Sequence, residues 1–298
     1  MQPIVGLAVA MLDVVEDGAG AMLLESRTPP LVQTIVGRVS QWPQVRALAL
    51  GGSHGTARAD ALSDLDFYVY IDAEVPLDLR AALAQEFAER MEINNSFWGP
   101  GDEWIDAATG RTVDLMYWSP EWIDGQLERV LVRHEPSVGY STCFWHTVQN
   151  TQPLYDRDGW FARLQAWAMQ PYPEPLRRAI VANNHPLLRT TIGSFLHQIE
   201  LAFTRGDIVS VQHRTTALLA SYFDVLFAVN AVPHPGEKRL VTWVKTRCTT
   251  IPQQMEAQIQ AILDVPLRPE HGSQLIERIH ALLDQLDIVL RAEGLIER

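Results

Sequence analysis

The chain has 298 residues, of which 47% are hydrophobic and 20% are charged, which is typical of a globular protein with a sizeable core. No apolar run approaches the roughly 18–20 residues that cross a bilayer, so we expect no membrane segment. The apolar segment 4–12 has no basic residue before it, which is not typical of a signal peptide. The two cysteines are far apart in the sequence, which fits a reducing compartment. We therefore expect a cytoplasmic protein.

The net charge of -12 lies entirely in the first half of the chain. Residues 1–135 contain 9 Lys+Arg and 21 Asp+Glu, and residues 136–298 contain the remaining 15 of each. A protein that binds DNA or RNA needs basic residues to neutralise phosphates. The charge distribution therefore argues against a nucleic-acid substrate and is compatible with a neutral or cationic small molecule.

The first half of the chain alternates predicted helices and strands. Apolar spacing predicts a helix over 31–42, which Pro43 ends, and then a buried strand over 45–50. A glycine-containing loop runs to about residue 63, and strict alternation predicts a strand over 64–71. The pattern then predicts a helix over 76–91, strands near 97 and over 104–107, a turn at 108–110 and a strand over 112–118.

The second half is predicted to be helical. Helical periodicity covers 120–132, 140–149, 158–169, 186–205, 208–230, 237–249, 252–263 and 271–293. The sequence therefore predicts an α+β fold: a small mixed sheet with flanking helices over 1–135, followed by an all-α helical domain over 136–298.

Gly52 and Ser53 follow the strand predicted over 45–50. The glycine pair Gly51-Gly52 permits unusual backbone angles and brings amide N–H groups close to a ligand. Successive amides in such a turn form an anion-binding concavity, to which the Ser53 hydroxyl adds a donor. This segment is therefore a candidate phosphate-binding turn.

Asp64 and Asp66 lie on the next predicted strand, separated by the apolar Leu65. Residues two apart on a strand project from the same face, and two such carboxylates repel each other unless a cation lies between them. Hard oxygen ligands of this kind suit Mg²⁺, which is commonly bound by one or two carboxylates together with substrate phosphates. The pair is a candidate metal site.

Asp114 is the third candidate acid, flanked by Val113 and Leu115 in the strand predicted over 112–118. If that strand lies beside the strand over 64–71, Asp114 meets the other two carboxylates. Three acids can hold two metal ions roughly 3.5–4 Å apart. Asp114 is also a candidate general base for a substrate hydroxyl.

Gly52-Ser53, Asp64-x-Asp66 and Asp114 together resemble the signature of the DNA polymerase β-like nucleotidyltransferase superfamily, over residues 48–118. The chain is similar to the small nucleotidyltransferases that modify aminoglycoside or lincosamide antibiotics. The resemblance implies that Asp64, Asp66 and Asp114 are catalytic metal ligands for two Mg²⁺ ions and that Gly52 and Ser53 contact phosphate. His54 and Gly55 depart from the pattern, because many members have another small residue and a nearby arginine there.

Three further residues are candidates for contact with the nucleotide. Arg58 supplies a basic group near the turn, although an ion pair with Asp60 or Asp64 explains it equally well. Ser63 adds a hydroxyl directly before the acid pair. Lys238 stands in the first turn of the helix predicted over 237–249, where a cation opposes the helix dipole unless an anion is near. It either reaches the triphosphate or is a solvated helix start.

The sequence thus predicts a metal-dependent nucleotidyltransferase that moves a nucleoside monophosphate, AMP from ATP, to a hydroxyl of a small acceptor such as an antibiotic and releases pyrophosphate. Two alternatives remain open: transfer to a protein side chain, as in toxin–antitoxin adenylyltransferases, and a non-catalytic nucleotide-binding protein. The expected partners are a nucleoside triphosphate and the acceptor, and a homodimer that shares its cleft is compatible with the sequence.

Overall fold

The computed structural model describes residues 13–17, 20–24, 28–51, 64–97 and 99–297. The chain folds into two compact units. The first comprises the described residues up to Asp124 together with Thr147–Met169, and the second comprises Gly125–His146 with the residues from Gln170 onward. The sequence predicts a single boundary near residue 135, whereas the chain passes between these units at 124–125, 146–147 and 169–170.

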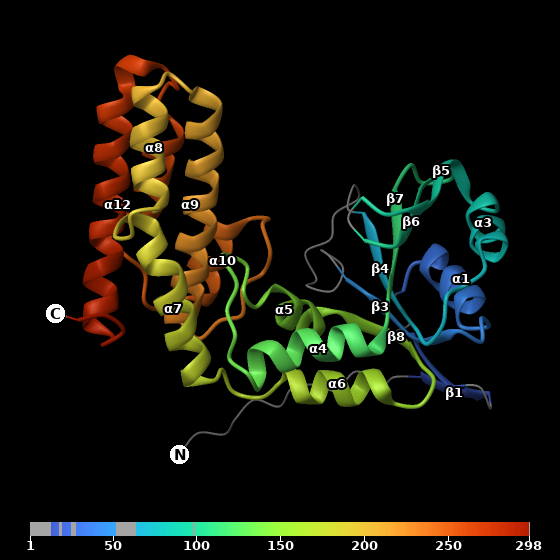
Figure 1. Ribbon diagram of the computed structural model, residues 1–298. Helices are drawn as coiled ribbons and strands as arrows, with labels where there is room; N and C mark the ends of the chain where they lie inside the picture. Colours follow the sequence, from blue (N-terminus) through green and yellow to red (C-terminus); the bar gives the residue numbers. More distant parts are fainter. Residues whose placement is uncertain (1–12, 18–19, 25–27, 52–63, 98, 298) are drawn as a thin grey trace, which may run out of the picture. The chain divides into compact units, whose positions relative to one another are not determined.

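The first unit is built on a mixed sheet. Among the described residues, eight strands pair in the order β1-β2-β8-β3-β4-β7-β6-β5 (Figure 1). The β4–β7 pair is parallel, and the other pairs are antiparallel. The strands are β1 (Asp13–Asp17), β2 (Gly20–Leu24), β3 (Val45–Leu50), β4 (Leu65–Ile71), β5 (Ala88–Asn95), β6 (Gly101–Asp106), β7 (Thr112–Trp118) and β8 (Gln152–Asp156).

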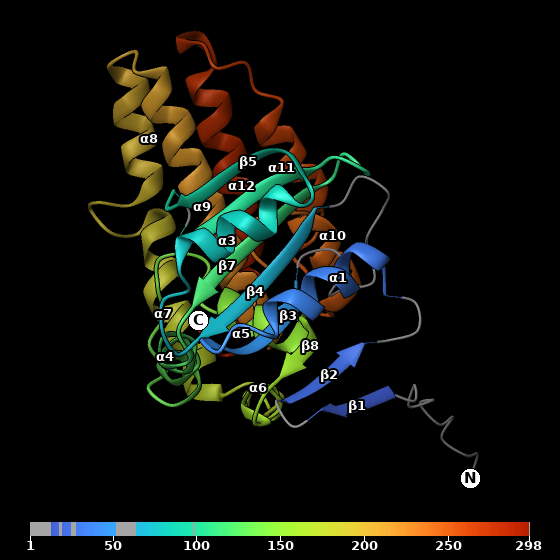
Figure 2. The same ribbon diagram turned by 90° about the vertical axis from the view of Figure 1, so that its right-hand side faces the viewer.

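One face of this sheet is covered by α1 (Pro30–Val39) and α3 (Leu77–Gln85) (Figure 2). Alternate side chains of the central strands, such as Phe67 and Leu115, pack in one buried cluster with Ile35 of α1. The intervening residues of β4 and β7 are mostly half-buried, as the predicted alternation requires. The predicted α+β fold, a mixed sheet with helices followed by a helical region, is confirmed.

The segment 86–97 differs from its prediction. The helix expected over 76–91 ends at Gln85, and β5 follows as an edge strand paired with β6. No strand forms at Phe97, whose side chain is 82% exposed. The helix-favouring residues of β5 become a strand because pairing with a neighbouring strand outweighs local propensity.

A second difference is β8, which was predicted as neither strand nor helix. It pairs with β3 on one side and β2 on the other. The helix that follows it, α6 (Trp160–Ala168), begins within the range predicted. The ring centroids of its Trp160 and Phe161 each lie 5.1 Å from the ring centroid of Tyr70 in β4. Tyr70 projects from the sheet face opposite α1 and α3, so α6 packs against that face.

The second unit is helical. A single apolar cluster joins α7 (Glu174–Arg189), α8 (Phe195–Thr204), α9 (Ile208–Val229), α10 (Leu240–Arg247), α11 (Met255–Leu263) and α12 (Gly272–Ala292). The prediction of one helix over 186–205 is wrong, because α7 begins at Glu174 and ends at Arg189, and α8 begins after Gly193 and the N-cap Ser194. Within the described residues, no helix is long and apolar enough to cross a membrane. The helices from residue 120 onward are α4 (Pro120–Leu131), α5 (Cys143–Asn150), α6, α7 (Glu174–Arg189), α8 (Phe195–Thr204), α9 (Ile208–Val229), α10 (Leu240–Arg247), α11 (Met255–Leu263) and α12 (Gly272–Ala292).

A buried polar cluster fixes the loop before α5 to α9. Asp224 of α9 accepts hydrogen bonds from the backbone N–H of Ser141 (3.0 Å), the Ser141 hydroxyl (2.6 Å) and the Asn184 amide (3.2 Å). His234 is fully buried, and its backbone N–H donates to Thr142 Oγ1 at 2.7 Å. Burial raises the pKa of Asp224 to about 6 and lowers the pKa of His234 to about 3.

We expect the free energy of unfolding of wild type to rise, relative to that of the Asp224→Asn variant, as the pH falls from 6 to 4. The raised pKa of Asp224 contributes stability that is fully present below its ordinary pKa of 3.8 and is lost as the pH rises through 6. One proton corresponds to a slope of about 1.4 kcal/mol per pH unit. The lowered pKa of His234 acts in the opposite sense, since the unfolded chain is protonated first below 6.5. Urea unfolding of both proteins between pH 4 and 7 measures the difference, and parallel profiles would contradict the raised pKa.

Candidate functional site

Asp66 and Asp114 are direct partners on neighbouring strands. In the parallel β4–β7 pair, the Cα of Asp66 lies opposite that of Asp114. Both alternate with buried residues, Leu65 and Val113 among them, so both project from the sheet face opposite α1 and α3. Neighbouring strands lie about 4.8 Å apart. The two carboxylates therefore share the setting that favours a bound cation.

The acidic row continues toward the edge of the sheet. Glu103 of β6 lies opposite Asp114, and Glu92 of β5 lies opposite Glu103. Glu92 accepts a hydrogen bond from Arg90 at 2.7 Å. In the sequence, Glu103 is one of three neighbouring acids that could attract a cationic acceptor, and nothing distinguishes Glu92. Only the strand register shows that both align with Asp114.

Gly51 joins the acidic row to the predicted phosphate-binding turn. Its backbone N–H donates to the carbonyl oxygen of Asp66 at 2.7 Å. A Cβ at this position would lie 2.2 Å from the Tyr68 ring, so a larger residue here would require that ring to move. Gly51, at the end of β3, therefore lies directly beside Asp66. Gly52, Ser53, Arg58 and Ser63 lie outside the described residues.

Aromatic rings lie beside the acids on the same sheet face. Tyr68 and Trp118 follow Asp66 and Asp114 by two and four residues, so they project from the same side. Their rings stack with centroids 4.5 Å apart, and Trp122 of α4 lies 4.9 Å from Trp118. Such π-faces can stack on a nucleobase or an aromatic acceptor.

Two predicted site residues lie differently from their predictions. Asp64 is exposed and directly precedes β4 instead of lying within it. Lys238 precedes α10 and does not stand in its first turn, because Arg239 adopts a left-handed conformation (φ 57°) at the N-cap. Lys238 belongs to the second unit, and its contact with a triphosphate stays a prediction.

The metal site itself also stays a prediction. Within the described part of the chain, no group of three or more His, Cys, Asp or Glu side chains is arranged to hold a metal ion. The structure brings Asp66 and Asp114 into register, and the role of Asp64 as a third ligand is untested.

Asp102 and Asp106 are buried although they alternate with Glu103 in an acidic hairpin. Asp102 forms an ion pair with Arg80 at 2.6 Å, and Asp106 accepts hydrogen bonds from the Thr109 backbone N–H (2.9 Å) and hydroxyl (2.6 Å). From the sequence alone, Asp102, Glu103 and Asp106 are interpreted as a hydrated hairpin edge, with attraction of a cationic acceptor as the alternative. The burial of Asp102 and Asp106 contradicts the first interpretation for these two residues. They stabilise the sheet and the turn at its end.

No family model and no curated protein matches the sequence. Among solved structures, the chain is similar to a nucleotidyltransferase-like protein from Exiguobacterium sibiricum. The match covers 88% of this chain and 74% of that one, with 12% sequence identity and a TM-score of 0.41.

Proposed function

We propose that this protein is a Mg²⁺-dependent nucleotidyltransferase that moves a nucleoside monophosphate, AMP from ATP, to a hydroxyl of a small acceptor and releases pyrophosphate. The observation that supports it most is the register of β4 and β7, which pairs Asp66 with Asp114 beside Gly51, the residue that precedes Gly52 and Ser53 in the sequence. We place this activity in the cytoplasm, where the free thiols of Cys143 and Cys248 stay reduced.

The donor set of this row fits Mg²⁺. Asp66 and Asp114 offer hard carboxylate oxygens from adjacent strands, and Mg²⁺ typically takes one or two such ligands with substrate phosphates completing its shell. When bound, Mg²⁺ supplies charge neutralisation for the triphosphate and the leaving pyrophosphate. In this proposal, Asp64, Asp66 and Asp114 hold the metal.

The protein's own groups orient the reactants. In this proposal, the backbone amides of Gly52 and Ser53, with the side chains of Ser63 and Arg58, bind the triphosphate. Asp114 accepts the proton of the acceptor hydroxyl as its oxygen attacks the α-phosphorus. The bond between the α-phosphorus and the oxygen that bridges it to the β-phosphate breaks, and pyrophosphate leaves with the electron pair.

The aromatic rings and the outer acids favour a particular kind of acceptor. Glu103 and Glu92 continue the negative row beyond Asp114, and the stacked Tyr68 and Trp118 rings lie beside it. An acceptor with positive charge or a flat ring suits this face. This leaves small cationic molecules, including antibiotics with amino groups, as the acceptors to test first.

Isothermal calorimetry tests the proposal. We expect one of ATP, GTP, CTP and UTP to bind in the presence of Mg²⁺, and we expect EDTA to abolish the binding. The Asp66→Asn variant should lose the Mg²⁺-dependent binding of the triphosphate. The Asp78→Asn variant makes an equal change of charge at an exposed position of α3, and it should keep that binding. If none of the four triphosphates binds with Mg²⁺, the proposal is wrong.

A further inference from the structure

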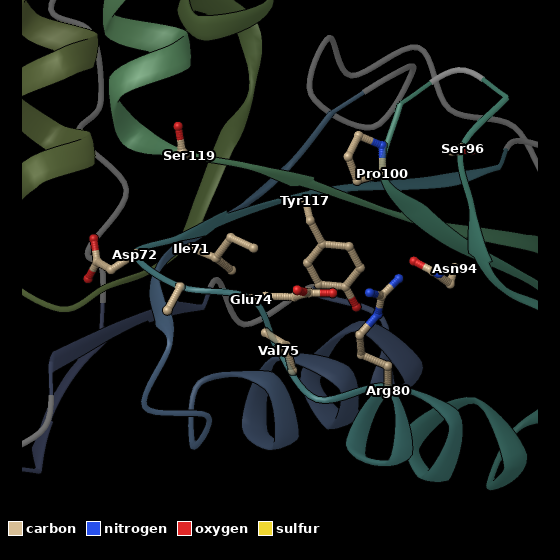
Figure 3. A pocket seen from close by; sticks show the side chains of 11 residues that line it. Ile71, Asp72, Glu74, Val75, Arg80, Asn94, Ser96, Pro100, Tyr117 and Ser119 are labelled. Atoms are coloured by element: carbon tan, nitrogen blue, oxygen red, sulfur yellow. The ribbon is translucent and has the colours of Figure 1, made fainter.

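A pocket of about 490 Å³ lies in the first unit at the carboxyl ends of the parallel strands β4 and β7 (Figure 3). The loop after β4, the end of the β5–β6 hairpin and Ser119 after β7 surround it. Tyr117, which lines it, is three residues from Asp114 and so projects from the opposite sheet face. The pocket is therefore separate from the acidic row.

The inner wall of the pocket contains a neutralised ion pair. Arg80 donates to both carboxylate oxygens of Asp102, at 2.8 and 2.6 Å, and the side chains of Arg80 and Asp102 are only 4% and 2% exposed. The Tyr117 hydroxyl donates to the same carboxylate at 2.8 Å, and the Arg80 guanidinium lies 4.4 Å from the Tyr117 ring centroid. Burial and the Asp102 charge raise the pKa of Tyr117, so this hydroxyl stays neutral. The positive charge of Arg80 is therefore already balanced.

The rim of the pocket carries an unbalanced negative charge. The Asp72 carboxylate oxygens lie 3.8 Å from Arg46 Nη1 and 3.7 Å from Arg157 Nη1, so two arginines balance its charge. Glu74 is exposed, and it forms no ion pair or hydrogen bond with any residue in the described ranges. Figure 3 shows the Glu74 carboxylate directed across the pocket toward the Tyr117 ring.

The remaining walls are largely apolar. Ile71, Val75 and Pro100 line the pocket beside the Tyr117 ring. Ligand sites of this size class are typically apolar with a few polar groups that fix orientation. An anionic ligand would meet the Glu74 carboxylate and find Arg80 already paired with Asp102. A cation would gain both a charge-assisted hydrogen bond and the nearby aromatic ring.

We propose that this pocket binds a small molecule with an apolar body and a single ammonium group, the ammonium held by Glu74 and the body packed against Val75, Pro100 and Tyr117. The ligand is not the acceptor of the proposed transfer reaction, because the pocket and Asp114 lie on opposite faces of the sheet. The pocket is thus a second ligand site, whose occupancy does not depend on nucleotide chemistry.

Calorimetry with the full chain and three matched pairs tests this inference. The pairs are phenethylamine with 2-phenylethanol, cyclohexylmethylamine with cyclohexylmethanol, and hexylamine with hexanol. We expect at least one amine to bind at least about 3-fold more tightly than its alcohol, as an ion pair with an exposed carboxylate implies. Glu74→Gln should reduce that preference to near equality, and Ala73→Trp, at an exposed position that lines the pocket, should weaken both members of the pair.

Two controls make the result specific. Asp78→Asn removes one negative charge from α3 at a position that does not line the pocket, and it should leave the amine preference unchanged. Binding of Mg²⁺ with a triphosphate should be the same in Glu74→Gln as in wild type, which separates this site from the proposed active site. Equal binding of each amine and its alcohol to wild type, an unchanged preference in Glu74→Gln, or no binding by any amine would overturn the inference.

Discussion

Replacing Asp114 with asparagine should lower pyrophosphate release from ATP, Mg²⁺ and a hydroxyl acceptor by about 10²- to 10⁴-fold, the range for loss of a general base. Asparagine keeps the shape of the side chain but cannot take the proton of the acceptor hydroxyl. It also removes a negative charge from the position opposite Asp66, which weakens the expected metal site. A coupled pyrophosphate assay over a panel of small hydroxyl compounds, with several acceptors bearing amino groups, measures the effect.

Glu103→Gln is the matched control for this variant. Glu103 lies one strand beyond Asp114 in the same row, so its replacement removes the same charge from the same face without removing the proposed base. We expect a smaller loss of rate, seen mainly as a higher KM for cationic acceptors. An Asp114→Asn variant that folds and keeps the wild-type rate would rule out the assigned role of Asp114.

Replacing Asp102 with asparagine should destabilise the protein by about 3–5 kcal/mol, as expected when one partner of a buried ion pair is removed. Arg80 would keep its charge with its side chain only 4% exposed. The Tyr117 hydroxyl and the backbone N–H of Asn94 would lose a charged acceptor at the same time. The free energy of unfolding from urea titrations of wild type and variant measures this loss.

Two comparisons test the physical reason for that loss. Arg80→Met combined with Asp102→Leu should recover most of the lost stability, because both buried charges are then removed together. Glu86→Gln breaks the Arg38–Glu86 pair, which is as short at 2.6 Å but has side chains 51% and 41% exposed, and it should cost less than about 1 kcal/mol. If the Asp102 and Glu86 variants lose equal stability, burial is not the cause.

Local periodicity predicted most of the elements that carry the candidate site. The alternation of Asp66 and Asp114 with apolar neighbours correctly placed each carboxylate away from the buried face. Alternation along one strand does not determine which strands are neighbours, so the pairing of β4 with β7 and the alignment of Glu103 came only from the structure.

The burial of Asp102 has a signal in the sequence. Asp102 is two residues from Trp104, which is fully buried, so both project from the buried face of β6. Its partner Arg80 is 22 residues away in the sequence, and no local pattern indicates that α3 brings the two together. Long-range contacts of this kind also explain β5, in which helix-favouring residues form an edge strand because β6 pairs with them.

The position of β8 has a consequence for the order in which the first unit can assemble during synthesis. A nascent chain that ends at residue 135 contains β3 and the β1–β2 hairpin but not the strand that lies between them. One edge of β3 then has open backbone N–H and C=O groups, which can pair with another chain. The β1–β2 pair, although it is synthesised before β3, can thus join the sheet only after residues 152–156 arrive.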